Sequence, residues 1–317
     1  MLSISASDKL EKAYPEDILK ILLGDTRSKD TQRAYLSDLR LFFKFVSSKQ
    51  NLTPELINNF LQLAREQAVI IVFRYKAYCL EKGLSEATIN RRLAAIRALV
   101  NMGNNVGVCN YSLDNIKGEK VKSYRDTSGV EISTFNKCLA LCNLSTAKGK
   151  RDYAMLHLLW SNALRRGEVA KLKVRDLDIV GNKLKIYGKG KGTQYQWVDL
   201  SSKTLEAINK WLSTHDQLTD DMPLFSSLHA GYIGQELTTT GIYKIVEAYF
   251  KSVTPKKMSP HRIRHSAITA ALDFYKGDVR KVQKLSRHES IETLMIYDDN
   301  RQNAQQEVSK SLADMLE

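Results

Sequence analysis

The chain contains few of the residues that build disulfide-bonded, zinc-binding or membrane-spanning proteins. Its 317 residues include four cysteines, too few for a disulfide framework in a chain of this length. Cys138 and Cys142 lie four apart, but no neighbouring Cys or His completes a zinc set. We therefore expect all four cysteines to be buried free thiols: Cys79, Cys109, Cys138 and Cys142.

Long hydrophobic runs are also missing. No apolar stretch approaches the roughly 18 residues that a membrane helix needs. The N-terminal segment MLSISASDKLEKAYPED is polar and mixed in charge, unlike a secretory leader. These absences favour a cytoplasmic protein with no membrane partner.

What the chain does have is positive charge, with a formal net charge of +13 and a pI of about 9.4. Residues 1–128 hold 20 Lys+Arg and 14 Asp+Glu, and residues 129–317 hold 28 and 21. Because both halves are basic, two domains gripping one polyanion fit better than a single basic tail. The charge alone leaves two interpretations open, a nucleic-acid partner or a generically basic soluble protein.

Apolar residues recur at helical spacing through the first hundred residues. Between residues 28 and 48 they form one face: Tyr35, Leu39, Phe42 and Val46. Thr53 and Pro54 are typical of an N-cap and a first-turn proline, and open a helix that we expect to reach about Glu66.

Two further helices complete this region. One is predicted over residues 68–82, with Gly83 as its C-terminal stop, and the next follows the cap Ser85. The last helix carries three candidate phosphate contacts, for which a solvated face is an equal alternative: Arg91, Arg92 and Arg97. We expect residues 1–110 to form an all-helical domain.

Residues 111–129 lose this periodicity and become polar and basic, which predicts an interdomain linker. Residues 130–317 alternate helices with a short sheet. In KLKIYGKGKGTQYQWVDL two strands flank the tight loop 188–192. The expected fold class is therefore mainly α with a small β-sheet, a helical domain followed by a mixed α/β domain.

The second domain holds several residue clusters that carry chemistry, each weak alone. Arg165 and Glu168, three apart, could form a surface ion pair on a helix. Lys189 lies in GKGKG, which lacks the spacing of a phosphate-binding P-loop and could be a solvated hairpin tip.

The same holds for the histidines and the tyrosine near the C-terminus. His261 and His265 lie four apart, but Arg262 occupies the position where a zinc protease motif needs glutamate. Taken singly, His288 and Tyr297 would usually be structural residues.

Together and in this order, the clusters resemble the tyrosine recombinases, the family of the phage integrases and the Xer and Cre recombinases. NALRRGEVAKLKVRDLD is similar to the family's first-arginine box, with Arg165 as the catalytic arginine and Glu168 as its acidic companion. Lys189 follows 24 residues later, in the hairpin where the family keeps its lysine.

Two later boxes complete the resemblance. SPHRIRHSAIT matches the His-x-x-Arg box through His261 and Arg264, and HESIETLMIY matches the last box through His288 and Tyr297. Upstream, TQRAYLSDLRLFFKFV and TINRRLAAIRALV resemble helices of the family's core-binding domain. The resemblance spans about residues 28–316. Because only about 27 residues precede it, a simple Xer- or Cre-like recombinase is favoured over one with an additional arm-binding domain.

The sequence departs from the family pattern at three places. Ala163 and Arg287 stand where the family usually has glycine, and Leu294 stands where a threonine is frequent. No departure removes a catalytic group. Arg287 puts the local turn geometry in question and is a candidate DNA contact, as is Lys191.

The resemblance implies a phosphodiester transfer. Arg165 and Arg264 would hold the charge that builds on the nonbridging oxygens, since guanidinium stays charged and can bind two oxygens at once. His288 would donate a hydrogen bond to the same phosphate. Lys189 would protonate the departing 5′ oxygen as general acid.

The nucleophilic hydroxyl must also be positioned or deprotonated. The hydroxyl of Tyr297 has an unperturbed pKa of about 10 and is a poor nucleophile unaided, so His261 would position or deprotonate it. Glu168 would orient Arg165 or a histidine without contacting the phosphate itself. The arginines hold the charge and the phosphotyrosine retains the bond energy, so neither a metal nor ATP nor another cofactor is expected.

The family also implies an assembly: two domains closing as a C-shaped clamp on double-stranded DNA, and a homotetramer exchanging strands through a Holliday junction. The segment 303–316 would be a C-terminal helix exchanged between protomers, and a prokaryotic protein would associate with the nucleoid. Two alternatives stay open, a type IB topoisomerase-like enzyme and a catalytically silent DNA-binding relative.

Overall fold

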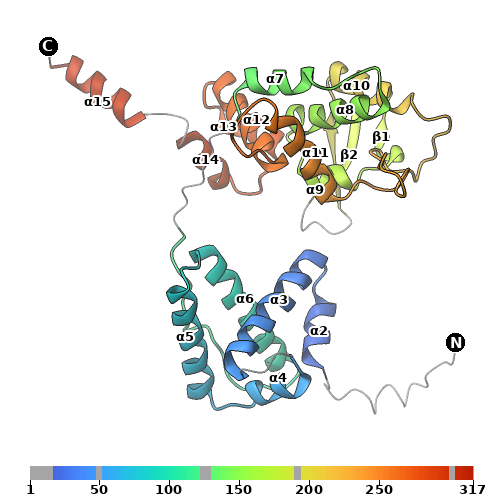
Figure 1. Ribbon diagram of the computed structural model, residues 1–317. Coiled ribbons are helices and arrows are strands. Elements are labelled where there is room, and N and C mark those ends of the chain that lie inside the picture. Colours follow the sequence, from blue (N-terminus) through green and yellow to red (C-terminus); the bar gives the residue numbers. More distant parts are fainter. Residues whose placement is uncertain (1–16, 48–51, 122–129, 189–193, 300–303, 317) are drawn as a thin grey trace, which may run out of the picture. The chain divides into compact units, whose positions relative to one another are not determined.

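The computed structural model describes residues 17–47, 52–121, 130–188, 194–299 and 304–316. The chain divides into two compact units, Met1–Lys122 and Ser123–Glu317 (Figure 1). The first is helical and the second combines helices with a small sheet, as the sequence predicts. Among the described residues, no helix has both the length and the apolar character needed to cross a membrane.

The described part of the first unit consists of helices packed around an aromatic core, α2 (Ile18–Asp25), α3 (Lys29–Ser47), α4 (Pro54–Leu61), α5 (Arg65–Glu81) and α6 (Glu86–Asn105). Phe42 lies at its centre, with its ring edge-on to Phe43, Phe60 and Tyr75 at centroid distances between 5.1 and 5.2 Å. The predicted cap is confirmed, since the Thr53 hydroxyl accepts the backbone N–H of Leu56.

Two helices of this unit differ from the prediction. Helix α2, which buries Ile18 and Leu22, was not predicted. The helix after Pro54 ends at Leu61 rather than near Glu66, because Ala64 adopts an extended backbone and starts α5 one turn later. Because no glycine or proline lies at this break, no local pattern predicts it.

The boundary of the first unit also requires correction. The stretch expected to be a linker from residue 111 contributes buried side chains to the helical core, and Tyr111 donates its hydroxyl to the Phe60 carbonyl at 2.7 Å. Asn90 fixes the chain further on, donating to the Glu119 carbonyl and accepting its N–H. The unit therefore extends to Lys122, and the rest of the expected linker, 122–129, lies outside the described residues.

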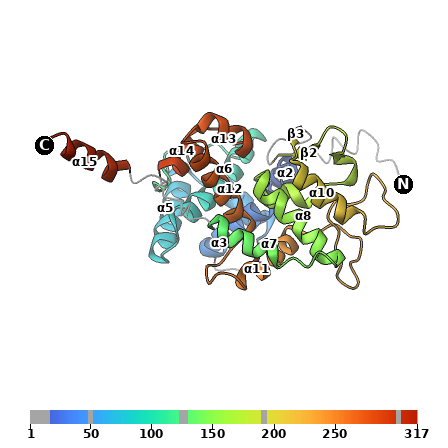
Figure 2. The ribbon, with the colours of Figure 1, turned by 90° about the horizontal axis from the view of Figure 1, so that it is seen from above.

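The second unit is built around helix α8 (Ala147–Ser161), which packs against several neighbours (Figure 2). Thr146 caps α8 by accepting the N–H of Gly149, and the residues from Ala154 to Leu159 are almost all buried. The other helices described here are α7 (Ile132–Ala140), α9 (Arg166–Ala170), α10 (Ser202–Leu212), α11 (Thr239–Lys251), α12 (Pro260–Phe274), α13 (Val279–Ser286), α14 (Glu292–Asp299) and α15 (Ala304–Asp314).

An antiparallel sheet, in the order β1-β2-β3, lies beside these helices, with strands β1 (Leu177–Asp178), β2 (Lys183–Tyr187) and β3 (Tyr195–Asp199). The side chains of β2 alternate, so Leu184 and Ile186 are buried while Lys185 lies over the ring of Tyr195 at 4.0 Å. The predicted two-stranded hairpin is confirmed. Its tip, with Lys189 and Lys191, lies outside the described residues.

A small separate core joins α12, α13 and α14 through the side chains Ala163, Ala267, Ile268, Leu272, Val282 and Leu294. Leu294 is fully buried in this core, which gives the departure from threonine a physical reason. The same packing docks α14, the helix that contains Tyr297. The four cysteines are buried and free, as expected.

Candidate active site

Arg165 and Glu168 form the first part of the candidate site. Arg165 is the N-cap of α9, and its N–H and Nη1 donate to the two oxygens of Glu168 at 2.8 and 2.9 Å. The Glu168 side chain is only 3% exposed, whereas that of Arg165 is 33% exposed. The alternative of a surface ion pair is therefore wrong, because a buried carboxylate holds an arginine whose other side reaches solvent.

Arg264 comes to the same place from α12. Ser259 caps this helix by accepting the N–H of Arg262. Arg264 is 1% exposed, and its two terminal nitrogens donate to the carbonyls of Ala163 and Ser286. These bonds connect the turn before Arg165 to the end of α13.

His288 joins this group from the loop after α13. Its Nε2 lies 3.3 Å from Nη2 of Arg264, and its carbonyl accepts from the side chain of Gln283 at 3.0 Å. The structure thus brings together Arg264, His288 and the segment holding Arg165, which are separated by up to 123 positions in the printed numbering.

Both positions where the chain departs from the family's glycine have a left-handed backbone. Ala163 has φ of 44° and Arg287 has φ of 55°. Such a conformation costs a residue with a side chain about 1–2 kcal/mol. The turn geometry that the sequence left in question is therefore kept without glycine.

His261 lies one helical turn from His265, and sequence reasoning gave His265 no catalytic role. The two Nε2 atoms are 2.7 Å apart, so one ring donates a hydrogen bond to the other. His265 is buried and His261 is exposed, an arrangement that orients the His261 ring. In the part of the chain that the structure describes, no group of three or more His, Cys, Asp or Glu side chains could hold a metal ion.

The remaining catalytic candidates are only partly placed. Tyr297 lies in α14, three residues after the buried Leu294, and its side chain is outside the described residues. Lys189 and Lys191 also lie outside them. The backbone of α14 packs on α12, which carries Arg264, and on α13, whose C-cap is Arg287.

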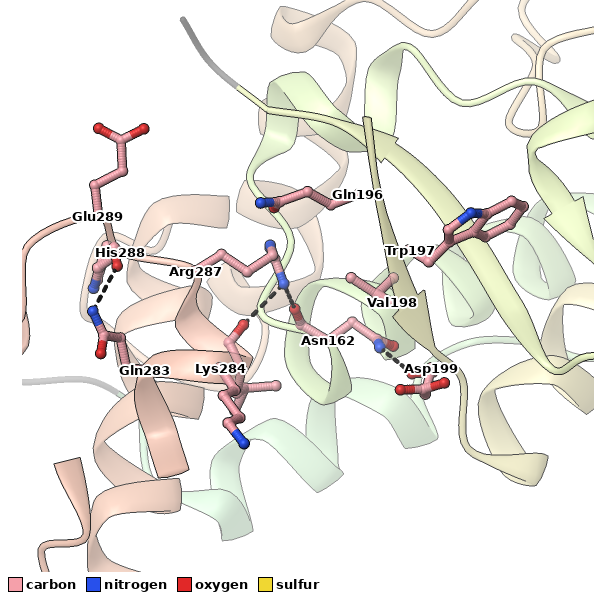
Figure 3. A pocket seen from close by; sticks show the side chains of 11 residues that line it. Asn162, Gln196, Trp197, Val198, Asp199, Gln283, Lys284, Arg287, His288 and Glu289 are labelled. Carbon is pink, nitrogen blue, oxygen red and sulfur yellow. Dashed lines mark hydrogen bonds between the residues drawn. The ribbon is translucent and has the colours of Figure 1, made fainter. Parts of the chain in front are cut away.

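A pocket of about 740 Å³ opens beside His288, between the end of α13 and strand β3 (Figure 3). It is lined by Asn162, Gln196, Trp197, Val198, Asp199, Gln283, Lys284, Leu285, Arg287, His288 and Glu289. The lining of the pocket therefore combines amides, carboxylates, cations and one indole. Such a surface can bind a polar ligand by hydrogen bonds and stack one planar group.

The arginines among the candidate DNA contacts have internal partners, and Lys191 lies outside the described residues. Arg91 pairs with the buried Asp38 at 3.0 Å, although its side chain is 49% exposed. Arg92 donates to the Tyr75 hydroxyl at 3.3 Å, and Arg97 donates to a backbone carbonyl.

Arg287 is the most buried of these arginines. Its side chain is 9% exposed, and its guanidinium donates to four internal oxygens. The side chain points into the protein toward Asn162 (Figure 3).

Comparison with known proteins agrees with this site. Residues 132–304 match the phage integrase family, and residues 19–102 match the phage integrase N-terminal SAM-like domain. A tyrosine recombinase of Synechococcus elongatus is 47% identical over 301 residues, covering 95% of this chain and 94% of the relative. One of Synechocystis is 45% identical over 302 residues, covering 95% and 96%.

A solved structure has the same fold. The XerH site-specific recombinase, in a post-cleavage complex with a palindromic difH substrate, superposes with a TM-score of 0.62 at 21% identity. The match covers 90% of this chain and 80% of that one. From the arginine and histidine boxes, the fold and these relatives together, the chain belongs to the phage integrase family of tyrosine recombinases.

Proposed function

We propose that the chain is an active site-specific recombinase whose nucleophile is Tyr297. The Tyr297 oxygen attacks the scissile phosphorus, the P–O5′ bond breaks, and a 3′-phosphotyrosine forms. The observation that carries the proposal is that Glu168 holds Arg165, while Arg264 is bound to the Ala163 carbonyl, two residues before Arg165, and lies next to His288. Attack by the freed 5′ hydroxyl of another strand reverses the step and rejoins the DNA.

The two arginines supply the electrostatic part of this chemistry. As phosphorus becomes five-coordinate, charge builds on the nonbridging oxygens, and fixed cations lower the barrier. Arg165 is held on one side by Glu168 and keeps a third of its side chain exposed toward a ligand. Arg264 is held by two carbonyls and is next to His288, which donates a hydrogen bond to the same phosphate.

Two side chains carry out the proton transfers of this reaction. His261, oriented by His265, positions or deprotonates the Tyr297 hydroxyl. Lys189, in the β2–β3 hairpin, protonates the departing 5′ oxygen. This scheme requires neither ATP nor a metal, because the phosphotyrosine retains the energy of the broken bond and the arginines hold the charge.

We also propose that double-stranded DNA is the partner, contacted by both units, and that four protomers assemble on two sites to exchange strands through a Holliday junction. Such a substrate would place the enzyme in the cytoplasm and, in a prokaryotic cell, with the nucleoid. Helix α15 and the two residues after it support the assembly proposal, because Leu312, Met315 and Leu316 are 58%, 77% and 90% exposed. A short helix with exposed apolar residues needs a surface to pack on, which a neighbouring protomer supplies.

The test is to trap covalent protein–DNA complexes on a library of nicked duplexes and sequence the captured DNA. We expect wild-type protein to yield denaturation-resistant adducts at a defined sequence. The variant Tyr297→Phe should yield none while binding DNA almost as well, because only a hydroxyl is removed. An adduct that persists in Tyr297→Phe would exclude this residue as the nucleophile.

The same experiment separates the two alternatives. A type IB topoisomerase-like enzyme would form adducts without sequence preference and relax supercoils as a monomer. A catalytically silent relative would bind DNA and form no adduct at all.

A further inference from the structure

Arg287 occupies a backbone position that does not favour arginine. It is the C-cap of α13 in the left-handed region, with φ of 55° and ψ of 34°, and its N–H closes the helix on the Gln283 carbonyl at 2.7 Å. Glycine would make the same backbone bond without a steric penalty. The reason for an arginine here must lie in its side chain.

That side chain joins three segments of the second unit. Nη1 donates to the carbonyls of Asn162 and Leu285 at 2.9 and 2.8 Å. Nη2 donates to the Ala163 carbonyl at 3.2 Å and to Oε2 of Glu168 at 3.1 Å. Figure 3 shows the guanidinium between the end of α13 and Asn162, at the edge of the pocket beside His288. Lysine could not reproduce this planar set of donors.

Two of these acceptors are shared with the proposed catalytic arginines. Oε1 of Glu168 accepts a hydrogen bond from Nη1 of Arg165. Oε2 accepts from the backbone N–H of Arg165 and from Nη2 of Arg287. The Ala163 carbonyl accepts hydrogen bonds from both Arg264 and Arg287. Arg287 therefore touches the support of each arginine, and its two terminal nitrogens already donate to four internal oxygens.

The electrostatics of the group agree with this geometry. Burial lowers the pKa of Arg287, the nearby charge of Arg165 lowers it further, and Glu168 raises it again. Burying a second cation on one carboxylate is unfavourable unless its hydrogen bonds are satisfied. Four oxygens within hydrogen-bond distance meet that condition for the two terminal nitrogens, whereas the buried Nε has no hydrogen-bond partner among the described residues.

We propose that Arg287 is a positioning residue, which fixes the Glu168 carboxylate and the Ala163 carbonyl so that Arg165 and Arg264 are both aimed at the scissile phosphate. This inference rests on the proposed function, because it assigns a role within the same site. It replaces the DNA contact expected from the sequence.

The test compares three full-length variants on the target sequence recovered with wild-type protein. Arg287→Met keeps the length and removes the charge, Arg287→Lys keeps the charge and loses the planar donors, and Arg287→Gly relieves the left-handed backbone. Arg151→Met is the matched control. Arg151 is also buried on a carboxylate, Asp152 at 2.7 Å, and donates to a backbone carbonyl, but lies outside the candidate site.

We expect Arg287→Met and Arg287→Gly to slow single-turnover adduct formation about 100-fold at saturating DNA, as a displacement of about 1 Å in a catalytic group does. DNA affinity should stay nearly unchanged. Arg287→Lys should recover little of the rate. Arg151→Met should lower the melting temperature without a selective loss of adduct formation at a temperature where it is folded.

A second substrate separates positioning from general damage. In a methylphosphonate, a methyl group replaces one nonbridging oxygen, so less charge must be held by the arginines. The Arg287→Met defect should therefore be much smaller on a scissile methylphosphonate than on ordinary DNA. If Arg287→Met fails to fold, Arg287→Gly serves for the same comparison.

Equal slowing on both substrates, or adduct formation at the wild-type rate, would overturn the positioning role. Weaker DNA binding with a wild-type rate at saturation would restore the DNA-contact role. Failure of the proposed function is a separate result, since wild-type protein itself would then form no Tyr297 adduct.

Discussion

Replacing Glu168 by glutamine tests the electrostatics of the whole candidate site. Glu168 is 3% exposed, and its two oxygens accept from Arg165 and Arg287. Glutamine has almost the same shape but no charge, and its amide group would face a donor. Two arginines would then share a site without a counter-charge.

The size of the effect follows from burial. Breaking a buried ion pair by removing one partner costs about 3–5 kcal/mol. Because Arg165 is partly exposed and solvent can compensate it, we expect the lower end, about 3 kcal/mol. In a unit of this size each kcal/mol lowers the melting temperature by about 2–4 °C, so Glu168→Gln should melt about 6–12 °C lower.

The matched control is Asp221→Asn in the same unit. Asp221 also accepts from two cations, Lys173 at 2.9 Å and Arg175 at 2.7 Å, but its side chain is 72% exposed. Solvent screens this pair, so the melting temperature should not change measurably. Thermal unfolding followed by circular dichroism compares both variants with wild type. If Glu168→Gln melts at the wild-type temperature, the ion-pair reasoning is refuted.

The remaining predictions concern the hairpin tip, the C-terminal helix and a buried histidine. Lys189→Ala should cleave ordinary DNA slowly and a 5′-bridging phosphorothiolate almost normally, because a thiolate leaves without a proton; equal defects would leave Lys191 as the acid. Deleting residues 303–317 should preserve binding of one protomer to a half-site but weaken tetramer assembly and recombination, and a truncated protein that recombines normally in mobility-shift and recombination assays would disprove helix exchange. Burial lowers the pKa of His157, helped by the charge of Lys203, so protonation favours the unfolded chain: stability is complete above the ordinary pKa of about 6.5 and falls as the pH drops below it. His157→Phe should flatten that decline in denaturant titrations between pH 7 and 5, and an unchanged slope would show that another group causes it.

The local patterns of the sequence were sufficient for most individual elements. Apolar spacing and the Thr53–Pro54 cap identified helices in the first unit, and alternation identified strands β2 and β3. Where no local signal exists, the predictions were wrong. Tyr111 looked like part of a polar linker because its burial depends on Phe60, 51 residues away along the chain.

The candidate site shows the same division. The boxes around Arg165, Arg264 and His288 could be read from residue types and order, because each box is a short local pattern. The roles of Ala163 and Arg287 could not, since a left-handed backbone and a buried guanidinium depend on partners 119 to 125 residues away. Sequence alone therefore determined the family and the chemical groups. Tertiary structure decided which groups share an acceptor, because only folding brings the end of α13 against the turn before α9.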